Sequence, residues 1–518
     1  MAGGSGQPGC GRILAAMIGL AALSSGATCA AETTLDAAGI RTLAATREDA
    51  AIALFREFLG LPNDAHDPGD ILRLIEWLEP QFESRGFTTR RIETGGSPAL
   101  YAERRFSDAQ DTALIYLQAD GQPVDPSKWE QADPYEATLK ARDPSGAWQT
   151  IEWPSDGHRL DPDWRVFARS AADSKGPMTQ FLVAIDALDE VEAAPPFNLK
   201  VIIDTEEELG SPHLAPALEA HRALLAADFL LVFDGPPHVS NRPTVTFGAR
   251  GITTLTLATY GPRVPQHSGH YGNFLPNPAF ELAHILASLK SPDGRVRVNG
   301  FYDGIAISDE IRGQLARVPD DEAGLLARMG VAEADTVAPS LQEALQYPSL
   351  NIRGLASGWV GDDARTIIPA TAVAEIDIRT VVESDPERLV ELVRKHIEAL
   401  GYRVLDREPT QSERLGGSVV TMTHQVAYGA FRSDFDAGAG RVARAGMRRL
   451  YGEEPILIRT LGGSVPIAPF VRTLGVPAAL VPTVNADNNQ HSPNENLRVG
   501  DFFEGIAIMI SVLLGDAR

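Results

Sequence analysis

Cysteine is almost absent from this sequence of 518 residues. Its two cysteines, Cys10 and Cys29, lie in an N-terminal segment that has the features of a cleavable leader. The mature chain therefore keeps at most one thiol, which excludes an internal disulfide framework and a metal site built from cysteine. Any metal ion must be bound by histidine and carboxylate side chains.

Long apolar runs and an excess of positive charge are also missing. No stretch after the N-terminal segment is long and apolar enough for a transmembrane helix, so we expect no membrane span in the mature chain. Basic residues number 46 against 69 acidic ones, which gives a net charge of −23. Because that charge repels polyanions, we expect no nucleic-acid partner, whereas metal cations are attracted.

Residues 1–31 have the pattern of a secretory signal peptide. Arg12 precedes an apolar stretch, 13–23, and small residues follow in 24–31. A membrane anchor is the alternative, but the stretch is short and rich in glycine for a bilayer span. Cys29 would suit a lipoprotein, although no leucine stands three residues before it. We therefore expect a secreted or periplasmic protein.

Apolar runs and helical periodicities alternate along the rest of the chain, which predicts an α/β fold. Residues 113–117 and 229–233 have the length of buried parallel strands. After Pro177, apolar residues recur at helical spacing up to Leu188. Residues 125–166 are rich in Asp, Pro and Trp and have no clear periodicity. Within them, W-E-Q-A-D-P-Y-E (129–136) resembles a substrate-side loop of known metallopeptidases, and a plain surface excursion is the alternative.

Carboxylates, one amide and one imidazole stand where the apolar runs end or in short polar motifs. The carboxyl ends of parallel strands form the ligand-binding edge of an open α/β sheet, so this set predicts a metal hydrolase. Taken singly, each aspartate is explained as well by a helix cap or a loop. The set consists of Gln118, Asp120, Asp173, Glu207, Glu208, Asp234 and His491.

Nine short blocks between about Leu72 and the C-terminus carry a family resemblance. They are Y-L-Q-A-D-G-Q-P-V (116–124), A-R-S-A-A-D-S-K-G-P (168–177), D-T-E-E-E-L-G-S-P (204–212), F-G-A-R-G-I (247–252), H-S-G-H-Y-G-N-F-L-P-N-P (267–278), G-R-V-R-V-N-G-F-Y-D (294–303), I-D-I-R-T-V (376–381), G-G-S-V-P-I (462–467) and H-S-P-N-E-N-L (491–497). In this order they resemble the metallopeptidase family of carnosinase, aminoacylase and carboxypeptidase G, most closely its carnosinase-like dipeptidases.

The resemblance implies a catalytic domain with a mixed, mostly parallel sheet and an inserted, smaller α/β lid and dimerisation domain. We expect the first catalytic part at 32–246, the insert at 247–411 and the second catalytic part at 412–518. A homodimer is implied, because His267 would reach into the neighbouring subunit's site and stabilise the oxyanion there.

The resemblance also implies two metal ions, zinc or else manganese or cobalt. Asp173 would bridge them; Glu208 and His491 would complete one site, and Asp234 with residue 118 the other. Glu207 would be the general base. The substrate carboxylate would be held by Arg379, Gly463 and Ser464.

One departure affects the metal site. The family's first motif is His-x-Asp, whereas this chain has Gln118-Ala119-Asp120. An amide oxygen is a poorer zinc ligand than a neutral imidazole. Asp120 also loses the histidine that it would orient. We therefore expect one tightly bound ion and a second, weaker one.

The predicted function is metal-dependent hydrolysis of an amide bond in dipeptides or small peptides with a free C-terminal carboxylate. An N-acyl amino acid amidohydrolase is an alternative, and the loss of the first histidine leaves a non-catalytic peptide-binding protein as another. Single residues also have non-functional explanations. These are a solvated acidic turn at 206–208, an ordinary loop histidine at His267 and a surface charge at Arg379.

Overall fold

The computed structural model of this chain describes residues 1, 3, 35–155, 159–235 and 237–516. Residues 36–518 form one compact unit, which contains every helix and strand of the described chain. Apart from positions 1 and 3, the expected signal segment and both cysteines lie outside the described residues, so the signal peptide stays a prediction. Within the described part of the chain, no helix is long and apolar enough to cross a membrane.

An eight-stranded sheet carries the strands that the apolar runs predict. β3 pairs in parallel with β7 and with β8, and β20 pairs in parallel with β8, whereas β1 and β2 run antiparallel at one edge. The predicted mixed sheet is confirmed. In spatial order its strands are β1 (Thr88–Ile92), β2 (Ala99–Arg104), β7 (Phe197–Asp204), β3 (Asp111–Gln118), β8 (Phe229–Val232), β20 (Ala478–Leu480), β9 (Thr244–Thr246) and β19 (Ile456–Ile458).

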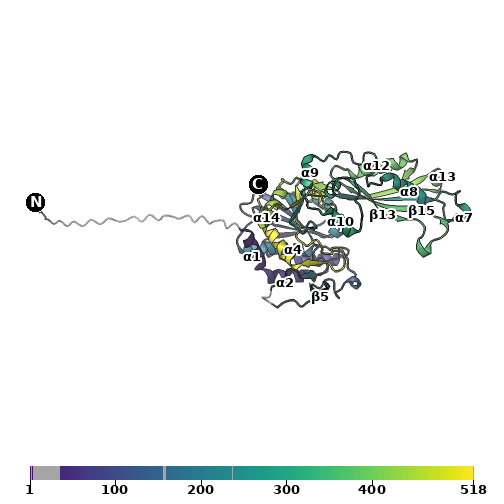
Figure 1. Ribbon diagram of the computed structural model, residues 1–518. Coiled ribbons are helices and arrows are strands. Elements are labelled where there is room, and N and C mark those ends of the chain that lie inside the picture. Colours follow the sequence, from purple (N-terminus) through teal and green to yellow (C-terminus); the bar gives the residue numbers. More distant parts are fainter. Residues whose placement is uncertain (2, 4–34, 156–158, 236, 517–518) are drawn as a thin grey trace. The chain divides into compact units, whose positions relative to one another are not determined.

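Helices cover both faces of this sheet (Figure 1). One layer contains α1 (Ala37–Ala45), α2 (Glu48–Leu59), α3 (Pro68–Glu83), α4 (Lys175–Glu190), α14 (Gly438–Tyr451) and α16 (Val499–Leu513). The other contains α5 (Leu214–Ala220), α6 (Arg222–Leu225) and α15 (Ala468–Leu474). Leu114 and Tyr116 of β3 pack against this second layer, and the residues between them point to the first because side chains alternate along a strand.

The C-terminal helix α16 is central to the first helical layer. It packs against both α4 and α14, and most of its residues, including all from Gly505 to Leu513, are buried. Gly446 of α14 permits the close approach, because a Cβ at this position would lie 2.6 Å from Val512 Cα. The N-terminal and C-terminal parts of the chain therefore share one core.

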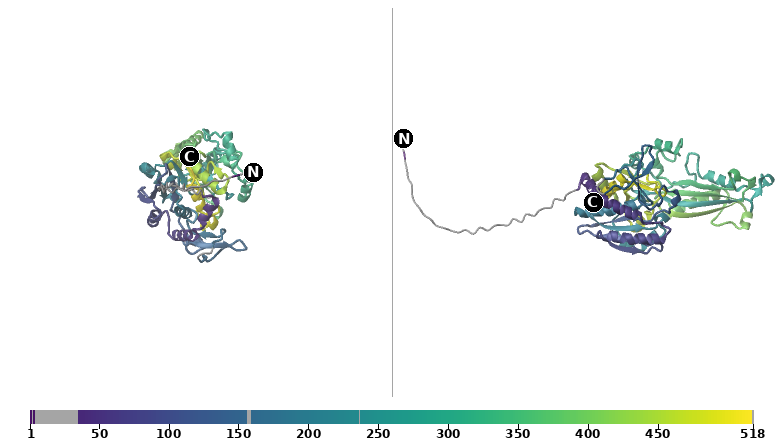
Figure 2. Two further views of the ribbon diagram at one scale, coloured as in Figure 1. Left: turned by 90° about the vertical axis from the view of Figure 1, so that its left-hand side faces the viewer. Right: turned by 90° about the horizontal axis from the view of Figure 1, so that it is seen from below.

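A five-stranded sheet forms most of the insert (Figure 2). In spatial order its strands are β13 (Ser349–Ala356), β15 (Thr371–Thr380), β11 (Gly251–Tyr260), β17 (Val419–Tyr428) and β16 (Arg403–Leu405). Alternate residues of β11 and β15 are buried, which is the pattern of a sheet with one covered face. That face packs against α8 (Pro278–Leu289) and α12 (Pro386–Ala399), which the sequence pattern anticipated.

The insert's sheet extends beyond the expected boundary at residue 411. β17 pairs with β11 from Ile252↔Tyr428 to Thr259↔Val420, so the chain leaves this sheet at Tyr428. The local sequence of β17 does not reveal its partner, because an apolar strand such as V-V-T-M-T suits either sheet. The division of the chain into domains remains a prediction, but this sheet clearly includes residues 419–428.

Residues 125–166, which lack periodicity, contribute to a third sheet of four short strands in the order β21-β6-β4-β5. These strands are β21 (Asn496–Arg498), β6 (Arg165–Phe167), β4 (Thr138–Arg142) and β5 (Trp148–Thr150). The pairing of β21 with β6 brings the C-terminal H-S-P-N-E-N-L block beside the segment that precedes Asp173. Part of the segment is therefore an ordered strand structure rather than a plain surface excursion, and residues 129–136, between η1 (Pro126–Lys128) and β4, remain a predicted substrate-side loop.

Several short elements complete the described chain. They are η1 (Pro126–Lys128), η2 (Glu207–Leu209), β10 (Gly248–Ala249), β12 (Gln266–His267), α7 (Ser268–Tyr271), α9 (Asp309–Leu315), α10 (Glu322–Met329), α11 (Leu341–Ala344), η3 (Gly361–Asp363), β14 (Ile367–Ile368), α13 (Gln411–Leu415) and β18 (Phe431–Arg432).

Candidate metal and catalytic site

The ends of three parallel strands deliver the first polar residues of the site. Gln118 is the last residue of β3, Asp204 is the last of β7, and these two residues are register partners. Asp234 follows β8 by two positions, and the turn η2 with Glu207 and Glu208 follows β7. Because these strands are neighbours in the sheet, their polar termini meet at its carboxyl edge, as the sequence predicts.

Asp173, Glu208 and His491 form a compact cluster at this edge. One ligand atom from each lies within 4.8 Å of those of the other two. His491 Nε2 is 3.0 Å from Asp173 Oδ2 and 3.3 Å from Glu208 Oε2. The hydrogen bond with Asp173 raises the pKa of His491 to about 9, although burial opposes this shift. Two carboxylates and an imidazole are a donor set that suits zinc, manganese or cobalt.

Gln118 and Asp234 lie next to the same aspartate. Gln118 Nε2 donates to Asp173 Oδ1 at 2.6 Å. The hydroxyl of Ser174 is 3.0 Å from Asp173 Oδ1 and 3.3 Å from Asp234 Oδ1. All three residues expected around the second ion, namely Asp173, Asp234 and Gln118, are therefore brought together, but the amide faces Asp173 with its NH₂ group.

The carboxylates of the site favour their protonated forms when no cation is bound. Burial, followed by the charge of Asp173, raises the pKa values of Glu208 and Asp234 to about 7. The same two causes, with Asp234 next in order, raise the pKa of Glu207 well above its usual range. A divalent cation would remove this repulsion, so the charge of the cluster fits a metal ion.

Asp120 has a partner that the sequence did not indicate. With no histidine at 118 to orient, its Oδ2 accepts a hydrogen bond from the backbone N–H of Glu208 at 2.9 Å. Burial and the nearby Asp204 raise the pKa of Asp120 well above its usual range. The side chain of Glu208 is held as well, because Gln122 Nε2 donates to its Oε2 at 2.8 Å. Asp120 and Gln122 therefore fix the turn that carries Glu207 and Glu208.

Glu495 is the main anchor of the Asp173 loop, and sequence analysis did not single it out. Its Oε2 accepts from Arg169 Nη1 at 2.7 Å and from the Ser170 N–H at 3.0 Å. Its Oε1 accepts from the N–H groups of Ala172 and Asp173, at 3.0 and 2.9 Å. Its only signal in the sequence is its place four residues after His491, in the last family block.

Two arginines meet the glycine-rich turn at 462–464. Arg379 Nη1 donates to Ser464 Oγ at 2.8 Å, so two of the residues predicted to hold a carboxylate are in contact, and Gly463 precedes Ser464 in the turn. Arg250, which the sequence analysis missed, lies close by: burial and then the charge of Arg379 lower its pKa to about 10. Its backbone N–H donates to Leu461 O at 3.1 Å. Two neighbouring guanidinium groups form a favourable site for an anion.

His267 is not brought to the cluster of its own subunit. The side chain is exposed, and its Nδ1 accepts from the Gly269 N–H at 3.0 Å. Among the described residues, no hydrogen bond or ion pair joins it to a carboxylate of the site. Tyr428 instead faces the site from the insert: its phenol oxygen lies 3.3 Å from where a Cβ on Gly210 would stand. Burial and the charge of Glu207 raise the pKa of this tyrosine, which keeps the phenol protonated.

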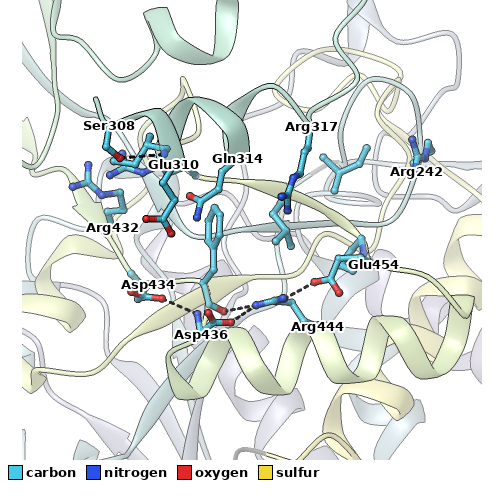
Figure 3. A pocket seen from close by; sticks show the side chains of 17 residues that line it. Arg242, Ser308, Glu310, Gln314, Arg317, Arg432, Asp434, Asp436, Arg444 and Glu454 are labelled. Atoms are coloured by element: carbon cyan, nitrogen blue, oxygen red, sulfur yellow. Dashed lines mark hydrogen bonds and ion pairs between the residues drawn. The ribbon is translucent and has the colours of Figure 1, made fainter. Parts of the chain in front are cut away.

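A cavity of about 820 Å³ between α9 and β19 contains none of the predicted site residues (Figure 3). Its wall has several arginines, but carboxylates neutralise most of them. Arg444 is paired with both Asp436 and Glu454, and Arg432 with Glu383. The cavity is therefore not the catalytic pocket.

An α/β fold whose carboxylates and imidazole converge at the sheet edge defines a metal-dependent hydrolase. The model of the peptidase family M20/M25/M40 matches residues 143–515, and the chain belongs to this family of metallopeptidases. The family resemblance found in the nine blocks is thereby confirmed, and the non-catalytic alternative is not favoured.

Individual relatives agree with this assignment. The Cys-Gly metallodipeptidase dug1 of Schizosaccharomyces pombe is 26% identical over 422 residues, which cover 79% of this chain and 81% of the relative. The Beta-Ala-His dipeptidase of Homo sapiens is 25% identical over 493 residues, 91% of each chain. Among solved structures, an M20 family metallo-carboxypeptidase from Sulfolobus solfataricus has a TM-score of 0.72 at 27% identity, covering 90% of this chain and 98% of its own.

The raised pKa values predict how pH affects the metal-free protein. Glu208, Asp234 and Glu495 have pKa values of about 7 when folded, and the usual values are near 4. The folded state therefore holds more protons, so the stability that they contribute is complete below about pH 4 and is lost as the pH rises through about 7. The pKa of His491, about 9, extends this loss to higher pH.

We expect the Tm of the metal-free protein to fall between about pH 6 and about pH 9. Excess Zn²⁺ should remove most of this fall, because metal binding requires deprotonated ligands. Thermal unfolding followed by circular dichroism, with chelator and with zinc, measures both curves. A metal-free protein that grows more stable over this range would contradict the prediction.

Proposed function

We propose that this protein is a dipeptidase that hydrolyses the amide bond of dipeptides or small peptides with a free C-terminal carboxylate. The observation that carries the proposal is the cluster of Asp173, Glu208 and His491, whose ligand atoms lie within 4.8 Å of one another. The partly buried Glu207 is the neighbour of Glu208 in the chain. The names of the relatives support the substrate class, because Cys-Gly and Beta-Ala-His are both dipeptides.

One divalent cation would be held by Asp173, Glu208 and His491, and a second by Asp173, Asp234 and Gln118. The chemistry of the donors favours Zn²⁺, and Mn²⁺ or Co²⁺ would also fit. When bound, such an ion lowers the pKa of water and polarises the carbonyl group that is attacked. The remaining steps are carried out by side chains of the protein.

Glu207 is the proposed general base. As a carboxylate it takes a proton from the attacking water, and it then gives that proton to the amine that leaves. Proton uptake is favoured by its surroundings, because burial and the charges of Asp173 and Asp234 raise the pKa of Glu207 well above its usual range. Asp120 and Gln122 act as positioning residues, since they hold Glu208 and thus the turn that presents Glu207.

The free carboxylate of the substrate would bind at Arg379. Its guanidinium already contacts Ser464 Oγ, and the backbone of Gly463 lies next to that hydroxyl. Arg250 adds a second positive charge, which would strengthen the attraction for an anion. An anchor for a carboxylate at a distance from the metal ligands favours a substrate with a free C-terminus over an internal peptide segment.

The functional unit would be a homodimer in which His267 of one subunit donates a hydrogen bond to the oxyanion in the other. Large apolar side chains are exposed along the free edge of the five-stranded sheet, at Ile352 and Leu355 of β13 and at Trp359 and Val360 after it. Exposed apolar residues on an unpaired edge strand are a typical surface for association. A second copy of this chain is the proposed occupant.

We also propose that the protein acts outside the cytoplasm. The support comes from the sequence, where Arg12, the apolar stretch 13–23 and the small residues of 24–31 have the order of a signal peptide.

Replacing Glu207 tests the role of the general base. Glu207→Ala should lower kcat by about 10² to 10⁴ and leave the zinc content intact, because this residue contacts the water rather than the ion. Glu206→Gln is the matched control: Glu206 accepts from the Ser97 N–H and pairs with His213, so kcat should be nearly unchanged. Loss of zinc from Glu207→Ala would show that Glu207 and Glu208 have exchanged roles.

Mixing two inactive variants tests the shared site. A hybrid of His267→Ala and Glu207→Ala subunits has one site with an intact Glu207 and the partner's intact His267. Free exchange between the two variants should restore about a quarter of the wild-type activity, since half the dimers are hybrids with one good site. Asp173→Ala mixed with Glu207→Ala is the control and should give no recovery. The same absence of recovery with His267→Ala, after proven exchange, would exclude the shared site.

Metal analysis tests the effect of Gln118. We expect one zinc ion per subunit after extensive dialysis and a second only at high zinc concentration, because an uncharged amide is a weak ligand. Gln118→His should retain two ions, with Asp120 available to orient the imidazole. Two tightly held ions in the natural sequence would refute the expectation.

A further inference from the structure

Two buried acceptor atoms at the Gln118 end of the site accept no hydrogen bond from any residue that the structure describes. They are Oε1 of Gln118 and Oδ1 of Asp120, and the two residues are only 3% and 1% exposed. The second polar atom of each side chain does form a hydrogen bond. Gln118 Nε2 donates to Asp173 Oδ1, and Asp120 Oδ2 accepts from the Glu208 N–H. A buried polar atom without a partner costs about 1–3 kcal/mol, so two adjacent ones indicate an incomplete arrangement.

The backbone places these two side chains on the same side of the sheet. The Ala119 N–H donates to Asp204 O at 2.9 Å, which continues the parallel ladder of β3 and β7 beyond Gln118. Residues two apart on extended backbone point in the same direction. The Gln118 side chain, whose amide contacts Asp173, therefore projects in the same direction as the Asp120 side chain.

A half-turn of the amide would satisfy both atoms at once. The oxygen and the NH₂ group of a glutamine exchange places when the amide rotates about its last bond, with almost no change in shape. In the turned orientation the NH₂ group can donate to Asp120 Oδ1. The oxygen then faces Asp173, where a cation can accept its lone pair.

We propose that Gln118 is a two-position ligand: its amide either holds Asp173 through the NH₂ group, or turns so that its oxygen binds a second divalent cation while its NH₂ group donates to Asp120. This inference rests on the proposed metal-dependent function. It assigns to Asp120 a second task, namely to stabilise the turned amide.

The two positions exclude each other, which links the amide to the occupancy of the second site. In the first position the N–H group occupies Asp173 Oδ1 at 2.6 Å and offsets part of its charge. The second ion must displace this hydrogen bond, and on the side of the amide the new bond to Asp120 compensates for the loss. The group that Asp120 presents to the amide therefore contributes to the affinity for the second ion.

Asp120→Asn reverses this preference and is the decisive variant. An asparagine keeps one oxygen for the Glu208 N–H, but it can present NH₂ to Gln118 Oε1 and so favours the first position. Zinc titration by calorimetry and metal analysis of dialysed full-length protein should show the second ion bound about 10- to 100-fold more weakly, the usual effect of losing such a partner. The first ion should be unaffected, because its ligands are Asp173, Glu208 and His491.

Two further variants separate this effect from a general loss of charge or of folding. Glu206→Gln removes one negative charge near the site, and residue 206 does not face Gln118. This variant should therefore leave both zinc affinities nearly unchanged. Gln118→Met keeps the length of the side chain but has no amide, so it should lose the second ion. Adding Asp120→Asn to Gln118→Met should then cause no further loss, since the two residues act through one hydrogen bond.

Each outcome decides between the proposals. The two-position ligand would be overturned if Asp120→Asn still bound the second ion tightly. It would also be overturned if Asp120→Asn lowered the affinity for the second ion equally with and without Gln118→Met. Either result would leave the dipeptidase proposal intact. Absence of zinc from both sites of the natural protein would overturn the metal-dependent function itself, and this inference with it.

Discussion

The burial of several carboxylates at one sheet edge is the constraint on which the site depends. Asp120 and Asp173 are buried, and Glu207, Glu208 and Asp234 lie beside them. Like charges in such a place repel one another and lose hydration, which is costly unless protons, hydrogen-bond donors or cations compensate. The fold supplies donors from neighbouring loops and strand ends: Glu208 offers its N–H to Asp120, and Gln118 offers its amide to Asp173. Bound cations would complete this compensation and at the same time create the reactive centre.

The same end of the five-stranded sheet carries three polar side chains, of which Tyr428 lies close to the turn with Glu207. Arg250 stands just before β11, Arg379 is next to last in β15, and Tyr428 is the last residue of β17. Ile252 is the register partner of both Arg379 and Tyr428, so the three residues lie in neighbouring positions across the strands. One end of the insert's sheet thus brings two guanidinium groups and a phenol together on adjacent strands.

Much of this architecture could be predicted, since it depends on local patterns. Runs such as 113–117 and 229–233 predicted buried parallel strands, and their polar ends predicted the ligand edge. The roles of Asp173 and His491 came from the family blocks, because residues 318 positions apart show no local sign of contact. Glu495, Gln122 and Tyr428 escaped notice because their function depends on long-range pairing, and for the same reason the sequence does not reveal that β17 joins the five-stranded sheet.

The dependence of the Asp173 loop on Glu495 has a consequence for how the protein is made. The loop leaves the ribosome more than 300 residues before its anchor, since Glu495 binds N–H groups 322 to 325 positions earlier in the chain. Until residue 495 has been synthesised, Arg169 and the N–H group of Asp173 lack the carboxylate that holds them in the folded protein. The catalytic centre can thus be assembled only after β21 has paired with β6 and brought Glu495 to the loop.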